Sequence, residues 1–371
     1  METLATGKTI SCLDLTLQHQ QIKSEVFDAF EQVYDHTAFS GGRFVEEFEN
    51  NFASFCETQY AVGVNNGTSA LQLAILALGI GPGDEVILPA NTFIATAWGV
   101  SYSGATPVFV DCTADTWQIN VDDIERSITD KTKAIIGVHL YGQPFDVAGV
   151  QDVCVRHGLH LIEDAAQAQG ARYLNKPVGG FGDMACFSFY PGKNLGACGE
   201  AGAITSNNAD YDKHLRSLRN HGSVIRYYHD EIGFNMRMGG LEAASLNVKL
   251  NYLPTWNARR QQIAHFYQDH INNSKITLQA QPSWATSVYH LFVVTTSNRD
   301  ELMKYLADHN IAAGLHYPVP CHLQKAYSHL DYEPGTFPNS EHLATHCLSL
   351  PMYAELSDDD VSFIVDTLNA F

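Results

Sequence analysis

The chain has 371 residues, 45% of them apolar and 17% charged, so its composition excludes wholesale disorder and its length predicts about two domains. It carries 22 Lys and Arg against 41 Asp and Glu, and the net charge of −19 repels nucleic-acid backbones and anionic membranes. We therefore expect no nucleic-acid partner and no membrane partner. No run approaches the ~20 apolar residues of a membrane span, and the first residues lack a secretory-signal pattern, which predicts a cytoplasmic protein.

Strand and helix patterns alternate along the first part of the chain. Residues 21–34 look helical and 40–42 form a turn. The helices that follow are expected at 69–78, 92–102, 121–128 and 145–157. The strands read as continuous apolar runs, which suits burial on both faces, at 60–64, 85–88, 107–110, 134–138, 160–162, 185–189 and 203–205. This alternation predicts an α/β fold with a mostly parallel central sheet and helices on both faces.

The pattern changes after residue 205. Helices are expected first, at 211–219, 241–253 and 258–271, with Pro254 interrupting between the last two. Then come a strand at 288–296, a helix at 299–309, a strand at 312–316, and a final helix at 358–370 with Ser357 as its N-cap. We predict a large domain over 1–254 and a smaller α+β domain over 255–371. The first ~40 residues could pack on the smaller domain.

The segment Asn65-Asn66-Gly67-Thr68-Ser69 lies directly between a strand and an apolar helix. Glycine lets backbone N–H groups approach an anion, and the helix N-terminus adds a positive dipole. Hydroxyl groups supply further donors. By itself the segment suits either a phosphate site or an ordinary helix cap.

Two ionisable residues follow buried strands. Asp164 stands at the end of the strand 160–162, where a carboxylate needs a partner such as a protonated ring nitrogen, although it could simply cap the next helix. Lys193 lies in a tight Gly/Pro turn after another strand. A lysine held away from water can lose its proton and act as a nucleophile, whereas most lysines are solvated.

An aromatic residue completes the set, because Phe93 opens a helix after a further strand and could lie flat on a planar cofactor or pack in the core. A phosphate site, a strand-end carboxylate, an aromatic plate and a turn lysine are together what pyridoxal 5′-phosphate (PLP) requires. The eight cysteines are scattered without a C-x-x-C pair. His157 and His160 are three residues apart, but Gly158 lies between them, so no helix presents them together. We therefore expect free thiols and no metal site.

The sequence resembles the DegT/DnrJ/EryC1/StrS family of sugar aminotransferases over nearly its whole length. This family has the aspartate-aminotransferase-like PLP fold, fold type I, and its motifs are specific. The resemblance is carried by FSGGRFVEEFE (39–49), NNGTSALQLA (65–74), GPGDEVILPANTFIATA (81–97), PVFVD (107–111), EDAAQAQGA (163–171), CFSFYPGKNLGACGEAGAI (186–204), RNHG (219–222) and LSLPMY (348–353).

The resemblance implies a role for each matching residue. Lys193 would bind PLP covalently, and Asp164 would pair with the pyridinium nitrogen. The remaining cofactor residues would be Gln167 beside the ring, Phe93 on its face, and Gly67, Thr68 and Ser188 at the phosphate. Asn235 would reach the phosphate of the neighbouring subunit's cofactor, which implies a homodimer with shared active sites. Relatives with histidine in place of the lysine dehydrate their substrates, so Lys193 favours transamination.

The same resemblance points to a substrate. The chain is most similar to enzymes that aminate C3 of a dTDP-3-oxo-6-deoxyhexose with L-glutamate as donor, in deoxyamino sugar biosynthesis for O-antigen or other glycans. Tyr190, His316 and Tyr317 would line the hexose, although His316-Tyr317 could equally end a strand with buried aromatic rings. The pyrophosphate needs a local basic group, for which the candidates are Arg219, Arg226, Arg237 and Lys325.

Three alternatives stay open. One is a C4 aminotransferase acting on a UDP- or dTDP-4-keto sugar, and another is an aminotransferase for cyclitol ketones. The third is a non-catalytic PLP-binding regulatory protein.

Overall fold

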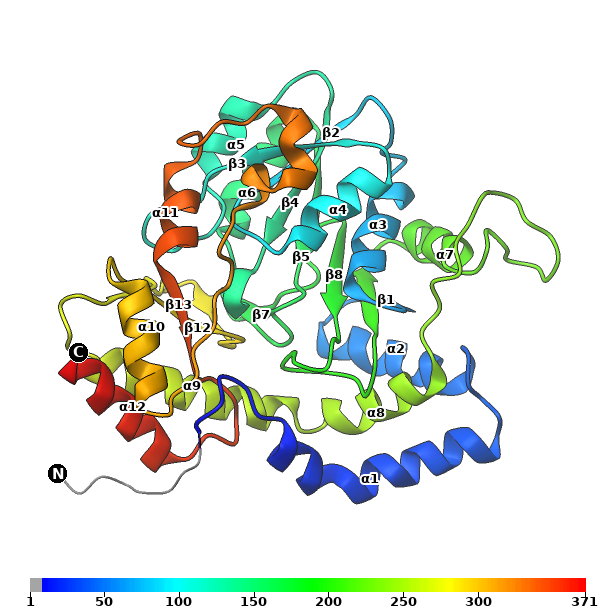
Figure 1. Ribbon diagram of the computed structural model, residues 1–371. Helices are drawn as coiled ribbons and strands as arrows, with labels where there is room; N and C mark the ends of the chain where they lie inside the picture. Colours follow the sequence, from blue (N-terminus) through cyan, green and yellow to red (C-terminus); the bar gives the residue numbers. More distant parts are fainter. Residues whose placement is uncertain (1–8) are drawn as a thin grey trace.

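A seven-stranded sheet forms the centre of the computed structural model, which describes residues 9–371 (Figure 1). All seven expected strands lie in this sheet, in the order β1-β9-β8-β5-β4-β2-β3. Only β9 runs antiparallel to its neighbours, so the carboxyl ends of the other six strands meet at one edge. The prediction of a mostly parallel sheet is confirmed. The strands are β1 (Tyr60–Val64), β2 (Glu85–Pro89), β3 (Thr106–Val110), β4 (Thr132–Val138), β5 (His160–Asp164), β8 (Met184–Ser188) and β9 (Gly202–Ser206).

Helices cover both faces of this sheet, because successive side chains of each strand point to opposite sides. On β1, Val62 packs with helices α3 and α4, whereas Ala61 packs with α2 and α8. The helices around the sheet are α2 (Arg43–Phe55), α3 (Gly67–Ala77), α4 (Ile94–Tyr102), α5 (Val121–Ser127), α6 (Val147–His157), α7 (Ala209–Leu218) and α8 (Gly240–Leu250), and a 3₁₀ turn, η1 (Leu140–Gly142), follows β4. Among the helices of residues 9–371, none is long and apolar enough to span a membrane.

A second, three-stranded sheet lies in the C-terminal part, in the order β10-β12-β13. Its core is formed with the helices around it and with Ile10 from the start of the described chain. A third small sheet joins β11 to β6 and β7. These elements are β6 (Arg172–Tyr173), β7 (Lys176–Pro177), α9 (Leu253–His270), β10 (Thr277–Leu278), β11 (Ala285–Thr286), β12 (Phe292–Thr295), α10 (Arg299–Asp308), η2 (Cys321–Leu323), η3 (Lys325–Leu330), α11 (Pro338–His346), β13 (Cys347–Leu350) and α12 (Asp358–Ala370).

Three local expectations were wrong. Residues 312–316 form no strand, because this segment makes only the isolated bridge of Gly314 to Ser349, and β13 supplies the third strand. The expected strand 288–296 shortens to β12. Pro254 does not interrupt a helix but lies in the first turn of α9, where its missing N–H removes no helical hydrogen bond. Ser357 caps α12 as predicted, accepting a hydrogen bond from the backbone N–H of Asp360.

The N-terminal helix α1 (Thr16–Asp35) runs along α8 on the outside of the molecule (Figure 1). The buried ammonium of Lys249 on α8 donates to His19 Nε2 at 2.9 Å and to the carbonyl oxygen of Gly196 at 2.7 Å. This contact ties α1 to the loop that follows Lys193.

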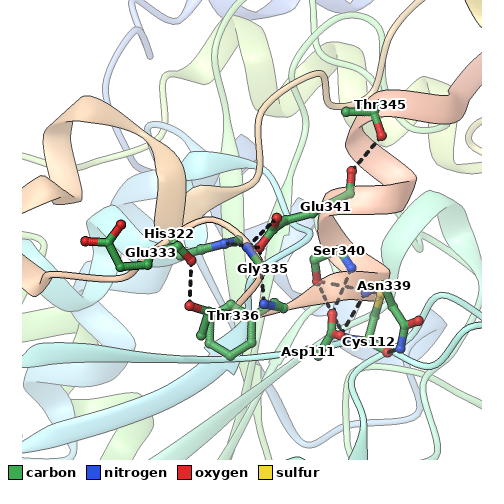
Figure 2. A network of polar contacts seen from close by, with 11 residues as sticks. Asp111, Cys112, His322, Glu333, Gly335, Thr336, Asn339, Ser340, Glu341 and Thr345 are labelled. Atoms are coloured by element: carbon green, nitrogen blue, oxygen red, sulfur yellow. Dashed lines mark hydrogen bonds and ion pairs between the residues drawn. The ribbon is translucent and has the colours of Figure 1, made fainter.

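A polar network joins the end of β3 to the start of α11 (Figure 2). The buried Asp111 carboxylate accepts from the backbone N–H groups of Asn339 at 2.9 Å and Ser340 at 2.8 Å, and from the Ser340 hydroxyl. These are first-turn N–H groups, which have no partner within a helix. Asp111 therefore caps α11 and fixes the C-terminal segment to the large sheet.

Candidate active site

Four of the predicted segments meet at the carboxyl edge of the central sheet. Gly67 follows β1, Phe93 follows β2, Asp164 ends β5, and Ser188 ends β8 a few residues before Lys193. Ligands of α/β proteins bind at this edge because the strand ends leave a crevice between the connecting loops. The topology therefore places the candidate residues around one position.

Asp164 is buried, and both of its carboxylate oxygens accept hydrogen bonds. The hydroxyl of Thr96 donates to Oδ2 at 2.7 Å, and the backbone N–H of Ala166 donates to Oδ1 at 3.1 Å. Burial raises the pKa of the Asp164 carboxyl, while these hydrogen bonds and the nearby charge of Lys193 oppose that rise. A cation placed against this carboxyl would keep it ionised.

Lys193 lies in the turn after β8, where its backbone N–H donates to the carbonyl oxygen of Tyr190 at 2.8 Å. Burial lowers the pKa of its amine to about 8, and the negative charge of Asp164 partly counteracts this effect. The unprotonated amine is therefore more accessible near neutral pH than that of an ordinary lysine, which suits a nucleophile or base.

The start of α3 and the end of β8 form a cradle. A Cβ atom added to Gly67 would lie 2.7 Å from Cβ of Ser188, so only glycine permits this approach. Asn66 caps the helix by accepting from the backbone N–H of Ser69, which leaves the first-turn N–H groups of Gly67 and Thr68 without helical partners. These N–H groups and the Ser188 hydroxyl suit a phosphate.

Gln167 connects the site to the C-terminal segment. Its Oε1 accepts from the backbone N–H of Tyr141 at 2.6 Å, and its Nε2 donates to the Tyr317 hydroxyl at 3.1 Å. The half-exposed ring of Phe93 lies 5.5 Å from the Tyr317 ring, and the Tyr141 hydroxyl donates to the carbonyl oxygen of His316. The structure thus brings Gln167, Phe93, His316 and Tyr317 together across about 220 residues of sequence.

Asn235 is not brought onto this cluster within one chain. It is exposed, at the base of the loop between α7 and α8, where it forms an isolated bridge with Asn220. This loop projects beyond α7 (Figure 1). The loop is anchored beside the phosphate cradle, because the carbonyl oxygen of Met236 accepts from the backbone N–H of Asn65. Tyr190, with 54% of its surface exposed, is joined to the cluster through its backbone, whose N–H donates to the Ser188 hydroxyl at 3.3 Å.

The four basic candidates for the pyrophosphate are dispersed. Arg219 donates to the buried Glu49 carboxylate and to the carbonyl oxygen of Gly63, so its guanidinium is already bound. Arg237 and Arg219 line a cavity of about 480 Å³ beside the projecting loop. Arg226 is exposed on that same loop, and Lys325 is exposed elsewhere on the surface.

Several buried polar residues of the site have no recognisable sequence signal. Thr96 lies within the family motif of residues 81–97, but the resemblance gives it no role. His139 and Glu163 form a fully buried pair behind Asp164, with Nε2 and Oε2 3.0 Å apart. Glu163 also accepts hydrogen bonds from three backbone N–H groups within residues 179–182. Burial raises the pKa of the Glu163 carboxyl, but His139 and the backbone hydrogen bonds together lower it below its ordinary value. In the sequence, the one indication of a role for Glu163 is its position next to Asp164 in a buried strand.

The residues present fit PLP. The Gly67–Ser188 cradle offers N–H and hydroxyl donors to a phosphate, and Phe93 offers a ring face. Asp164 is a buried carboxyl to which no cation of residues 9–371 is directly hydrogen-bonded. Lys193 supplies an amine of lowered pKa. A mostly parallel sheet with these residues at its carboxyl edge fits the PLP-dependent enzymes of fold type I.

The chain belongs to the DegT/DnrJ/EryC1/StrS aminotransferase family, whose model matches residues 20–369, and it is a PLP-dependent sugar aminotransferase. It is 43% identical to the dTDP-3-amino-3,6-dideoxy-alpha-D-galactopyranose transaminase of Aneurinibacillus thermoaerophilus, covering 98% of this chain and 99% of that protein. It is also 43% identical to the erythromycin biosynthesis sensory transduction protein EryC1 of Saccharopolyspora erythraea, covering 96% and 98%. The structure of S. venezuelae DesV with a ketimine intermediate is 41% identical, covers 98% of both chains and superposes with a TM-score of 0.96.

Proposed function

We propose that this enzyme transfers the amino group of L-glutamate to a keto group of a nucleotide-linked sugar, at C3 of a dTDP-3-oxo-6-deoxyhexose. The observation that carries the proposal is the shared buried setting of Asp164 and Lys193 beside the Gly67–Ser188 cradle. Bound PLP supplies an electron-withdrawing ring, which makes a proton on the amine-bearing carbon acidic. The substrate class is supported by the printed names of relatives that are dTDP-3-amino sugar transaminases.

Each residue has a separate task in this proposal. The Asp164 carboxylate holds a proton on the ring nitrogen, and Thr96 keeps that carboxylate in position. Lys193 would hold the cofactor covalently at rest, and its Nζ, once released, would carry the proton that moves during amino transfer. Gly67, Thr68 and Ser188 hold the phosphate, while Phe93 and Gln167 orient the ring.

Tyr190, His316 and Tyr317 would contact the sugar. The Tyr317 hydroxyl accepts from Gln167, so its own proton remains free to donate to a sugar oxygen. Both arginines line the cavity, but Arg237 is the better candidate for the pyrophosphate. Among the described residues its guanidinium hydrogen-bonds to Asn220 alone, whereas Arg219 is bound to Glu49. We further propose a homodimer in which the loop carrying Asn235 reaches the partner's cofactor phosphate.

The decisive experiment offers the enzyme, loaded with pyridoxamine 5′-phosphate, a panel of dTDP- and UDP-linked 3-keto and 4-keto sugars. Amino sugars are detected by mass spectrometry. We expect amination of 3-keto deoxyhexoses on dTDP, and exclusive amination of 4-keto sugars would overturn the regiochemistry. The amino donor is assigned by measuring how fast glutamate, aspartate and alanine each decrease the absorbance of enzyme-bound PLP. A faster decrease with aspartate or alanine would refute glutamate as the donor.

A regulatory function is the second candidate, because one relative is named as a sensory transduction protein. The same assays separate the two functions. A regulator would bind PLP without releasing any amino sugar, and it would not convert glutamate to 2-oxoglutarate. We expect both products to form.

A further inference from the structure

Tyr141 has an unusual backbone conformation in the turn that follows β4. Its φ of 63° and ψ of 6° lie in the left-handed region, which large L side chains rarely adopt, and its side chain is buried. Such a conformation persists only where surrounding contacts hold it, and it is found most often at functional sites. The contacts of Tyr141 therefore indicate what this conformation supports.

All three hydrogen-bonding groups of Tyr141 have partners, and the partners come from separate segments. Its backbone N–H donates to Oε1 of Gln167 at 2.6 Å, and its carbonyl oxygen accepts from the backbone N–H of Leu291 at 3.3 Å. Its hydroxyl donates to the carbonyl oxygen of His316, because a backbone carbonyl can only accept. Tyr141 thus joins Gln167, beside the proposed cofactor ring, to the segment that carries Tyr317.

The hydroxyl of Tyr141 holds the backbone on which Tyr317 is carried. The carbonyl oxygen that it binds belongs to the peptide bond between His316 and Tyr317. The ring of Tyr317 then lies 5.5 Å from the half-exposed ring of Phe93. Loss of the Tyr141 hydroxyl would leave this peptide without the contact and allow the Tyr317 ring to move relative to Phe93.

The backbone N–H of Tyr141 sets the direction of the hydrogen bond at Tyr317. An N–H can only donate, so Oε1 of Gln167 must face Tyr141, and Nε2 must face the Tyr317 hydroxyl, 3.1 Å away. The Tyr317 hydroxyl is therefore the acceptor. Burial raises its pKa, so it keeps its own proton, and no hydrogen bond among residues 9–371 uses that proton. Tyr317 can donate it to a group bound in the site.

We propose that Tyr141 is a positioning residue for Tyr317. Its hydroxyl fixes the peptide that carries Tyr317, and its N–H orients the Gln167 amide so that the Tyr317 hydroxyl donates to the bound ketosugar. The inference rests on the proposed contact between Tyr317 and the sugar. Tyr141 acts through these two neighbours, so it governs how tightly the sugar is held and does not take part in amino transfer from glutamate.

The first test compares Tyr141→Phe with Tyr267→Phe. Tyr267 is the matched control, because it is equally buried and its hydroxyl also donates to a backbone carbonyl oxygen, that of Pro351 at 3.0 Å, in the core of the C-terminal sheet. Both variants lose one buried hydrogen bond and should lose similar free energies of unfolding. An effect on the sugar that appears only in Tyr141→Phe is therefore not a general effect of destabilisation.

The two half-reactions are measured separately. For enzyme loaded with pyridoxamine 5′-phosphate, Tyr141→Phe should raise the half-saturating concentration of a dTDP-3-oxo-6-deoxyhexose by about tenfold. The rate at which glutamate converts enzyme-bound PLP should stay within about twofold of the wild-type rate. Tyr267→Phe should change neither value. Equal slowing of both half-reactions by Tyr141→Phe, or equal effects of the two variants, would overturn the proposal.

A double-mutant cycle shows whether Tyr141 acts through Tyr317. Tyr317→Phe alone should raise the half-saturating sugar concentration by about tenfold or more. Adding Tyr141→Phe to that variant should raise it by less than about threefold further, because the hydroxyl being positioned is already absent. Independent effects that multiply would refute action through Tyr317.

The last measurement needs no sugar. In PLP-loaded enzyme labelled with fluorotyrosine, the ¹⁹F resonance of Tyr317 is identified as the one lost in Tyr317→Phe. Tyr141→Phe should displace this resonance, and Tyr267→Phe should leave it in place. An unmoved resonance would refute the role of Tyr141, whatever the substrate. A displaced resonance in an enzyme that aminates no ketosugar would support the positioning of Tyr317 and refute the proposed function instead.

Discussion

The charges of Asp164 and Lys193 stabilise each other at the carboxyl edge of the central sheet. Burial raises the pKa of the carboxyl and lowers that of the amine to about 8, and in each case the opposite charge reduces the effect of burial. The two residues end different segments of the sheet edge and are 29 positions apart in sequence. Because the two charges interact, a change in the charge of either residue shifts the pKa of the other.

The coupling can be measured with Asp164→Asn. The amide preserves shape but removes the negative charge that raises the pKa of Lys193. The midpoint for acylation of Lys193 in cofactor-free enzyme should therefore fall below about 8. Transamination should drop by about 10²-fold or more, because a neutral amide no longer holds the proton of the ring nitrogen. An unchanged midpoint would show that the two groups do not interact.

Replacement of Lys193 by alanine should abolish covalent binding of PLP. Borohydride reduction of the wild type should leave a pyridoxyl group on the peptide containing Lys193, and none in the variant. Activity should fall by at least ~10³-fold, since both the nucleophile and the proton carrier are lost. Lys304→Ala is the control, because Lys304 is exposed and its ion pair among the described residues is with Asp308 on the surface. Label on another lysine of the wild type would contradict the assignment.

Gly67→Ala should weaken cofactor binding by about tenfold or more. The new Cβ would meet Ser188 at 2.7 Å and push the start of α3 away from the end of β8. Gly81→Ala is a matched control, since its Cβ would meet nothing closer than the carbonyl oxygen of Ser103 at 3.5 Å. The dissociation constant of PLP, measured by absorbance titration, should be near the wild-type value only in the control. If Gly67→Ala bound PLP as tightly as the wild type, the proposal that Gly67 and Ser188 hold the phosphate would be refuted.

Asp111→Ala should reduce the free energy of unfolding by about 2–3 kcal/mol, because the first-turn N–H groups of Asn339 and Ser340 lose their acceptor, the first part-buried and the second buried. Ser357→Ala removes an exposed cap of α12 and should cost about 1 kcal/mol. Urea denaturation of both variants gives the comparison. If both variants lose the same free energy of unfolding, the Asp111 contact stabilises the protein no more than an ordinary exposed helix cap does.

His19 should make the protein sensitive to acid. Burial and the charge of Lys249 lower the pKa of this imidazole, so the folded state binds fewer protons than the unfolded chain. The free energy of unfolding should therefore hold above about pH 6.5 and fall as the pH decreases below that value. His19→Gln keeps an acceptor for Lys249 but does not titrate, so its unfolding profile between pH 7 and pH 5 should be flatter than that of the wild type. Parallel profiles would exclude the contact as a source of acid sensitivity.

The sequence by itself determined the central sheet and the segments at its edge. Continuous apolar runs identify strands buried on both faces, and the Gly-rich or polar segments after them identify where each strand ends. Because the carboxyl ends of parallel strands meet, Gly67, Phe93, Asp164 and Lys193 had to lie near one another once the sheet was predicted. The family motifs then assigned each of them a role, and the experiments above test those roles.

Only the tertiary structure decided the polar contacts that support the site. Thr96 bonds Asp164 across 68 residues, Asn194 meets His290 across 96, and Gln167 meets Tyr317 across 150. Side-chain periodicity tells which face a residue occupies, but a hydrogen bond depends on which distant segment packs against that face. The same reason explains the wrong strand at 312–316, since an apolar run becomes a strand only where a neighbouring backbone pairs with it.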